Sequence, residues 1–163
     1  MLAASSLQME LPIAAAAAAL IWAAVSDIRL YIIPNRTVAI IGAAFAVFAC
    51  AMPWSFAIGG VLAGLIVFAV AVTFFARGWM GGGDAKLMTV VALWAGSSYL
   101  STFALVTSLA GAALGIVMLT PASRIMPAPS AEALGVARQP MPFGLPIAAG
   151  GLAVLAQYLL LPR

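Results

Sequence analysis

The chain has 163 residues, of which 66% are hydrophobic and only 7% are charged. A soluble domain would be about one quarter charged, so this composition predicts a membrane protein with little chain left for a separate aqueous domain. The net charge is +3 and the basic residues are scattered singly, which argues against a nucleic-acid-binding surface. There is no histidine and one cysteine, Cys50, so no internal disulfide or multi-cysteine zinc site can form, and we expect no metal and no cofactor.

Apolar runs along the chain predict an all-α fold, a bundle of about six transmembrane helices in one membrane-embedded domain over 1–163. The first run holds six consecutive alanines, and no Lys or Arg precedes it, so we interpret it as a retained helix rather than a cleaved signal peptide. A later run, 87–119, is too long for one crossing and is interrupted at Gly96, Ser97 and Ser98, so we divide it there. The predicted spans are about 11–26, 37–52, 57–76, 86–96, 99–119 and 143–161.

The positions of the basic residues predict the orientation of this bundle. With six spans, the loops at about 27–36, 77–85 and 120–142 lie on one side of the membrane. In or beside these loops are six of the seven basic residues, namely Arg29, Arg36, Arg77, Lys86, Arg124 and Arg138, whereas Arg163 is at the other side. Lys and Arg accumulate in short cytoplasmic loops, so we expect these three loops in the cytoplasm and both termini outside it.

Two aspartates are the residues most able to carry chemistry. Asp27 opens the run DIRLYIIPN, and Asp84 closes the glycine triplet of GGGDAKL; they are two of only four acidic residues. Each lies at the edge of an apolar run, where an aspartate can have a purely structural role. Asp84, for example, could be the N-cap of the fourth span. The predicted topology, however, brings both to the cytoplasmic face.

Two carboxylates can hydrolyse a peptide bond without a metal. Close together in a partly apolar site, they share a proton, so one is ionised and draws a proton from water while the other donates to the substrate carbonyl oxygen. We therefore predict Asp27 and Asp84 as the catalytic pair. Which of them begins as the base is left open, because such a pair titrates as a unit.

Gly81, Gly82 and Gly83 are predicted as substrate-binding residues, because a backbone without side chains can approach an extended peptide. The alternative is a flexible turn between spans; a phosphate-binding loop is not favoured, since the lysine followed by serine or threonine is missing. Lys86 is expected mainly to set orientation, with lipid headgroups as partners, and secondarily to bind substrate. Glycines four residues apart, as in Gly60 and Gly64, predict close helix packing rather than a dedicated dimer contact, so the oligomeric state is left open.

These motifs resemble those of the prepilin peptidases, membrane aspartyl proteases of the GxGD type that are related to the archaeal preflagellin peptidases. Asp27 with the following Ile-Pro-Asn matches the family's first catalytic aspartate, and Gly81, Gly83 and Asp84 match its GxGD element. The continuation GDAKL and the late Pro142-Phe143-Gly144 are also similar to family features.

The resemblance implies removal of a short, positively charged leader from prepilins or pilin-like proteins at the cytoplasmic face of the bacterial inner membrane, in pilus biogenesis. Larger members also methylate the new amino terminus and carry a cytoplasmic zinc-binding domain with paired cysteines. This chain has neither the domain nor the cysteines, so it resembles the short form of tight-adherence (Flp-type) pilus systems, and we expect no methylation. The competing interpretations are a small membrane transporter, which would place its carboxylates near the bilayer midplane, and a structural membrane subunit with capping aspartates.

Overall fold

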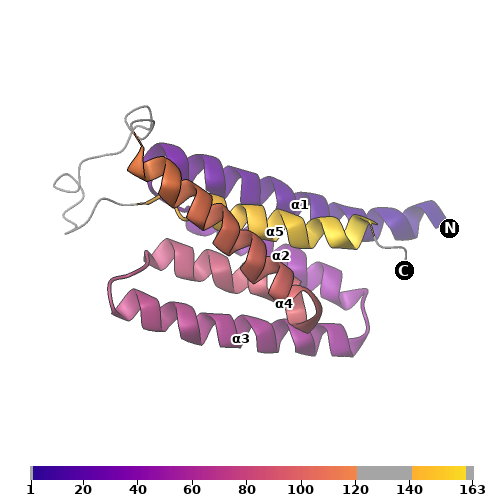
Figure 1. Cartoon of the computed structure of the whole chain (residues 1–163). Helices are drawn as coiled ribbons and strands as arrows, with labels where there is room; N and C mark the ends of the chain where they lie inside the picture. The colour runs from indigo at the N-terminus through magenta and orange to yellow at the C-terminus, as the bar shows by residue number, and fades with distance from the viewer. Residues whose placement is uncertain (1, 121–140, 161–163) are drawn as a thin grey trace.

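The computed structural model describes residues 2–120 and 141–160, and these ranges contain helices and no strand. The helices are α1 (Leu2–Leu30), α2 (Asn35–Cys50), α3 (Trp54–Ala76), α4 (Gly82–Leu119) and α5 (Gly144–Leu160), as Figure 1 shows. The predicted all-α class is confirmed. The predicted loop over 120–142 lies almost entirely outside the described residues.

The predicted number of helices is wrong, because five are counted rather than six. The difference lies in α4, where the predicted spans 86–96 and 99–119 are joined in one helix of 38 residues. The helix is not regular, however: Gly96 has φ 53° and ψ −160°, a conformation that interrupts helical geometry. Beyond Gly96 the second segment of α4 runs back toward the end of the bundle where the first segment begins (Figure 1). The interruption therefore occurs where the sequence predicts it.

Three of the described helices, α1 from Met9 onward, α3 and α4, are long and apolar enough to cross a membrane, while α2 and α5 are shorter apolar helices. The outer surface supports a bilayer location. On α3, for example, Leu65 is 58% exposed and Ile66 is 60% exposed. An apolar surface of this extent suits contact with lipid rather than water.

Helix α4 packs against α3, α5 and α2, and α1 packs against α2 and α5. Glycines permit the closest approaches: a side-chain carbon on Gly60 would lie 2.6 Å from the Leu93 carbonyl oxygen, and one on Gly64 would lie 2.6 Å from the Leu93 side chain. The predicted close packing of Gly60 and Gly64 is confirmed as a contact between α3 and α4.

Aromatic side chains around Trp94 fill the end of the bundle where α4 turns back. The indole Nε1 of Trp94 donates to the Ile41 carbonyl oxygen at 3.1 Å, and the ring lies 5.1 Å from that of Phe48. The Tyr158 hydroxyl donates to the Trp94 carbonyl oxygen at 2.7 Å. This bond satisfies a backbone acceptor two residues before the interruption at Gly96, which a bilayer interior would otherwise penalise.

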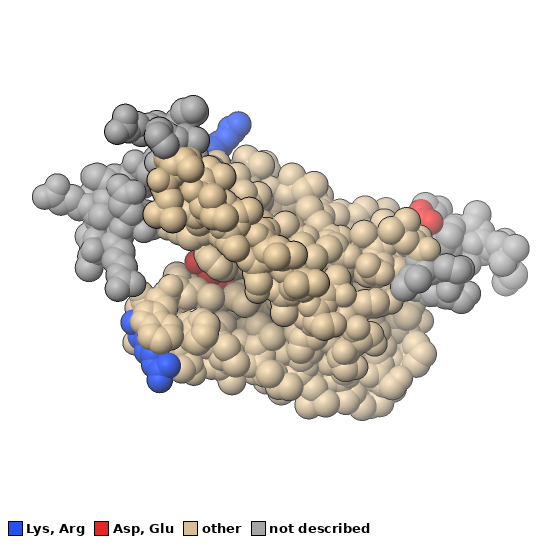
Figure 2. All heavy atoms as spheres, in the orientation of Figure 1, with Lys and Arg blue, Asp and Glu red and all other residues tan. Residues whose placement is uncertain are grey.

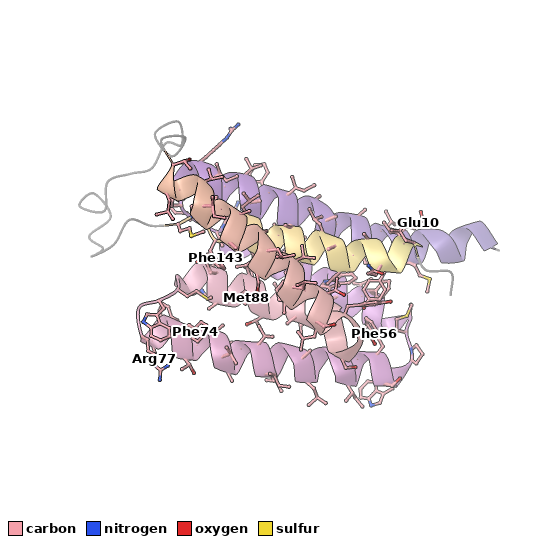
Figure 3. The ribbon with its side chains drawn as sticks, viewed as in Figure 1. Glu10, Phe56, Phe74, Arg77, Met88 and Phe143 are labelled. Carbon is pink, nitrogen blue, oxygen red and sulfur yellow. The ribbon has the colours of Figure 1, made fainter. Side chains whose placement is uncertain are left out.

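The two ends of the bundle differ in charge. Figure 3 shows Arg77 and Phe74 at the end where α3 passes into α4, and Glu10 at the opposite end. The other basic residues of the described part also lie near this end. Arg29 is near the end of α1, Arg36 is at the start of α2 and Lys86 is near the start of α4. The candidate site lies at this basic end.

Candidate active site

Asp27 and Asp84 line one cavity of about 280 Å³ at the basic end of the bundle. The other residues that line it come from the α1–α2 and α3–α4 connections: Tyr31, Ile32, Ile33, Gly81, Gly82 and Gly83. In Figure 2 acidic atoms are visible inside a hollow at this end, with basic side chains beside it. The structure thus brings together, in one cavity, the two aspartates that the sequence singled out.

Asp27 lies inside α1, not in the loop that the sequence predicted from residue 27. Its backbone carbonyl accepts the N–H of Tyr31 at 2.9 Å, which extends the helix through Leu30. The side chain is only 5% exposed, and its Oδ2 accepts a hydrogen bond of 2.7 Å from the backbone N–H of Gly144. This bond fixes the carboxylate from α5, far away in the sequence. Its geometry requires glycine, since a side-chain carbon on Gly144 would lie 2.8 Å from Oδ2.

Asp84 lies in the first turn of α4. The N-cap is Gly81, whose carbonyl accepts the N–H of Ala85 at 3.1 Å, so the N-cap interpretation of Asp84 is wrong and the predicted loop 77–85 ends four residues early. The Asp84 carboxylate lies against the backbone of Gly81. A side-chain carbon added to Gly81 would be 3.0 Å from Oδ2 of Asp84. A carboxylate in a first helical turn is stabilised by the free backbone N–H groups there.

The two motifs that carry the aspartates are in direct contact. A side-chain carbon on Gly83 would lie 3.2 Å from the Cβ of Ile33, so the α1–α2 connection rests on the first turn of α4. Lys86 Nζ donates to Asn35 Oδ1 at 3.2 Å. These contacts explain the Ile-Pro-Asn element: it holds the residues after Asp27 against the helix that carries Asp84.

Hydrogen bonds at each end of the α1–α2 connection hold it in place. The Ser26 hydroxyl donates to the Ile32 carbonyl oxygen at 2.7 Å, and the Thr37 hydroxyl donates to the Pro34 carbonyl oxygen at 2.7 Å. Pro34 itself is extended, as a residue preceding a helix should be, and a proline disfavours a helical conformation of the residue before it, Ile33. The connection is therefore a defined wall of the cavity.

The predicted substrate-binding residues differ in position. All three glycines line the cavity, but Gly82 and Gly83 also pack tightly, against Phe75 and Ile33. Gly82 and Gly83 lie in α4 and have a packing role there, while the binding of substrate by the three glycines stays a prediction. Lys86 does not line the cavity, and its described bond is to Asn35, so its role in binding substrate stays a prediction.

Two residues of the site were not assigned a role from the sequence. Gly144 belongs to the Pro142-Phe143-Gly144 feature, but nothing in that triplet indicates a hydrogen bond to Asp27. Tyr31 lies within DIRLYIIPN and lines the cavity. A signal for Tyr31 was present, since a tyrosine four residues after a membrane-edge aspartate lies about one helical turn from it.

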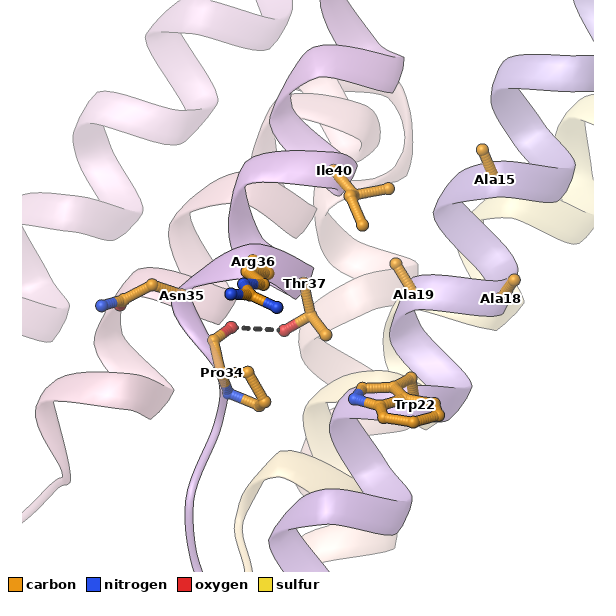
Figure 4. Close-up of a pocket in the computed structure, with 9 residues that line it drawn as sticks. All are labelled: Ala15, Ala18, Ala19, Trp22, Pro34, Asn35, Arg36, Thr37 and Ile40. Atoms are coloured by element: carbon orange, nitrogen blue, oxygen red, sulfur yellow. Dashed lines mark hydrogen bonds between the residues drawn. The ribbon is translucent and has the colours of Figure 1, made fainter.

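A second hollow, of about 820 Å³, lies between α1 and α2 (Figure 4). Alanines and Trp22 of α1 face Ile40, Thr37 and Arg36 of α2 across it. Neither aspartate lines this hollow, and its walls are mainly apolar, so the smaller cavity is the candidate active site.

The fold and the site define an α-helical membrane protein with two carboxylates that line one cavity, one near the end of α1 and the other in the first turn of α4. The chain belongs to the type IV leader peptidase family, whose model matches residues 14–116, a segment that includes both aspartates. The family is one of proteases, and the predicted relationship to the prepilin peptidases is thereby confirmed. Searches among curated proteins and among solved structures gave no significant match.

Proposed function

We propose that this protein is a membrane aspartyl endopeptidase that removes the leader peptide from prepilins or pilin-like proteins. The observation that carries the proposal is the shared cavity of Asp27 and Asp84 in a chain of the type IV leader peptidase family. Its place is the cytoplasmic face of a bacterial inner membrane, an assignment supported by the basic residues around the cavity.

The reaction follows from two carboxylates that share a proton. The ionised one takes a proton from a water molecule, whose oxygen forms a bond to the scissile carbonyl carbon. The protonated one donates to the carbonyl oxygen, and collapse of the tetrahedral intermediate breaks the C–N bond as a proton passes to the leaving amine. The N–H of Gly144 holds Asp27 in a fixed orientation, which reduces the cost of forming this arrangement.

The position of the carboxylates argues against a transporter. Asp27 is three residues from the end of α1 and Asp84 is in the first turn of α4, whereas a coupling site for ions would lie near the middle of the helices. A cavity at a helix end can admit both water and an extended segment of a membrane-anchored substrate. We also propose that the protein cleaves without methylating the new amino terminus.

Substitution of the aspartates tests the proposal. The full chain is co-expressed with a prepilin, and leader removal is compared for the parent, Asp27→Asn and Asp84→Asn. Each variant keeps the side-chain shape but loses an acid needed for proton transfer, so cleavage should fall about 100-fold or more. Glu10→Gln is the matched control, because Glu10 is exposed at the opposite end of the bundle and should not affect cleavage.

Parental cleavage by either aspartate variant, with equal amounts of protein in the membrane, would contradict the paired-carboxylate mechanism. Mass spectrometry of the mature pilin separates peptidase activity from methylation, since a methyl group adds a fixed mass to the product. A methylated product formed by the purified chain would overturn the second part of the proposal.

A further inference from the structure

Tyr31 has a backbone conformation that a tyrosine rarely adopts. It follows the last residue of α1 with φ 54°, and it is the one non-glycine residue with positive φ in the described ranges. Helices often end with a residue in this left-handed conformation, but that residue is usually glycine, which has no steric penalty there. The turn after α1 therefore explains the conformation but not the tyrosine.

The side chain of Tyr31 places a polar group where nothing described satisfies it. Its hydroxyl is buried and has no hydrogen-bond partner within residues 2–120 and 141–160. A buried hydroxyl without a partner destabilises the folded protein, so such groups are rare and usually have a functional reason. Tyr31 thus costs stability twice, through its backbone and through its hydroxyl, at a position where glycine would avoid both costs.

The location of Tyr31 indicates what that reason is. It lines the cavity of about 280 Å³ together with Asp27 and Asp84. Asp27 already receives the backbone N–H of Gly144, so the hydroxyl is not needed to orient that carboxylate. Burial and the negative charge of Asp27 both raise the pKa of the Tyr31 hydroxyl, so it remains protonated and able to donate.

We propose that the Tyr31 hydroxyl donates a hydrogen bond to the carbonyl oxygen of the peptide bond that is cleaved between Asp27 and Asp84. This inference rests on the proposed peptidase function. As the water oxygen adds to the carbonyl carbon, negative charge develops on the carbonyl oxygen, and a fixed donor in a partly buried cavity stabilises it. Tyr31 keeps its proton throughout the reaction. The aspartates transfer the protons, and the Tyr31 hydroxyl only donates a hydrogen bond to the carbonyl oxygen.

The test compares Tyr31→Phe with the parent enzyme, using the purified full chain in detergent and a prepilin substrate. Loss of a donor that acts in the transition state should lower kcat about 100-fold and leave KM within about two-fold. The thermal unfolding temperature should be unchanged or higher, because the substitution removes an unsatisfied hydroxyl.

Tyr158→Phe is the matched control. Its hydroxyl does have a partner, the Trp94 carbonyl oxygen, at the opposite end of α5 from Gly144. This variant should unfold at a lower temperature and keep the parental kcat. A second variant, Tyr31→Gly, suits the positive φ and removes the whole side chain. It tests the role of the hydroxyl if Tyr31→Phe accumulates poorly, and it should fold and lose kcat to a similar extent.

Two results would overturn the inference while leaving the peptidase function intact: parental kcat in both Tyr31→Phe and Tyr31→Gly, or loss of kcat that only parallels a lower unfolding temperature. A rise in KM with unchanged kcat would also overturn it, because the hydroxyl would then bind substrate without acting on the transition state. Absence of cleavage by the parent itself would instead reject the proposed function on which the inference rests.

Discussion

At the residue scale, the site depends on one backbone group that positions an acid. The N–H of Gly144 reaches Asp27 across 117 positions of sequence. A charge-assisted hydrogen bond of this kind both stabilises the carboxylate and restricts its rotamer. The two aspartates could be identified from the sequence because acids are rare beside apolar runs, but a backbone donor leaves no signature in residue types. Gly144 could therefore be found only in three dimensions.

Gly144→Ala tests the importance of that contact. The new carbon would lie 2.8 Å from Oδ2 and 3.0 Å from Cγ of Asp27, so the carboxylate must move. A displacement of about 1 Å at a reacting group can lower the rate about 100-fold, and cleavage of a prepilin should fall by roughly this factor. Gly115→Ala is the control, since its carbon would lie 3.9 Å from Met141 Cε and should have no effect on cleavage. Equal activity of the two variants would contradict a positioning role for Gly144.

At the scale of elements, the central feature is the interruption of α4. Gly96 adopts a positive φ that only glycine takes without strain, and this allows the second segment to fold back over the bundle. The Gly-Ser-Ser triplet was sufficient to predict the position of the interruption. It was not sufficient to predict that helical structure continues on both sides of Gly96 without a connecting loop, because that depends on the hydrogen bonds of the neighbouring turns.

The ends of α1 and α4 differ from those predicted from the sequence. Helix α1 continues past Asp27, and α4 begins before Asp84, because polar residues at a membrane edge can still make regular backbone hydrogen bonds. The sequence placed both acids in loops on the grounds of polarity alone. The consequence is functional, since side chains on helices are held more rigidly than side chains on loops.

The contact between α3 and α4 gives a prediction about stability. Gly60→Ala would place a carbon 2.6 Å from both the Leu93 carbonyl oxygen and the Phe45 ring. The helices must separate to admit it, which should destabilise the protein by about 1–3 kcal/mol. Gly42→Ala is the matched control, because its carbon would lie 3.8 Å from Val90, an ordinary contact. Thermal unfolding in detergent measures both, and equal unfolding temperatures would show that the glycine contact is not important for packing.

At the scale of the whole molecule, the distribution of charge defines two unlike ends. The described basic residues gather around the cavity, whereas Arg124, Arg138 and Arg163 lie outside the described part of the chain. The start of α1 and the end of α5 lie together at the opposite end (Figure 1). If the basic end faces the cytoplasm, both of these helix ends face away from it.

Cysteine labelling tests this orientation. In a Cys50→Ser background, Ser55→Cys places a thiol at the start of α3, and Trp79→Cys places one between α3 and α4; both positions are exposed. A membrane-impermeant maleimide should label Ser55→Cys from the periplasm and should label Trp79→Cys only after the inner membrane is permeabilised. The reverse pattern would place the cavity outside the cytoplasm and contradict the proposed location of cleavage.

The sequence by itself determined the bilayer setting, the helical class, the interruption near Gly96 and the two acids, because each of these depends on composition or on neighbours along the chain. Tertiary structure alone decided that Asp27 and Asp84 share one cavity, that Gly144 orients Asp27, and that the Tyr31 hydroxyl is buried without a partner among the described residues. The physical reason is that these are contacts between helices. These contacts depend on where glycines allow two helix backbones to approach each other, and this cannot be deduced from the order of residues along the chain.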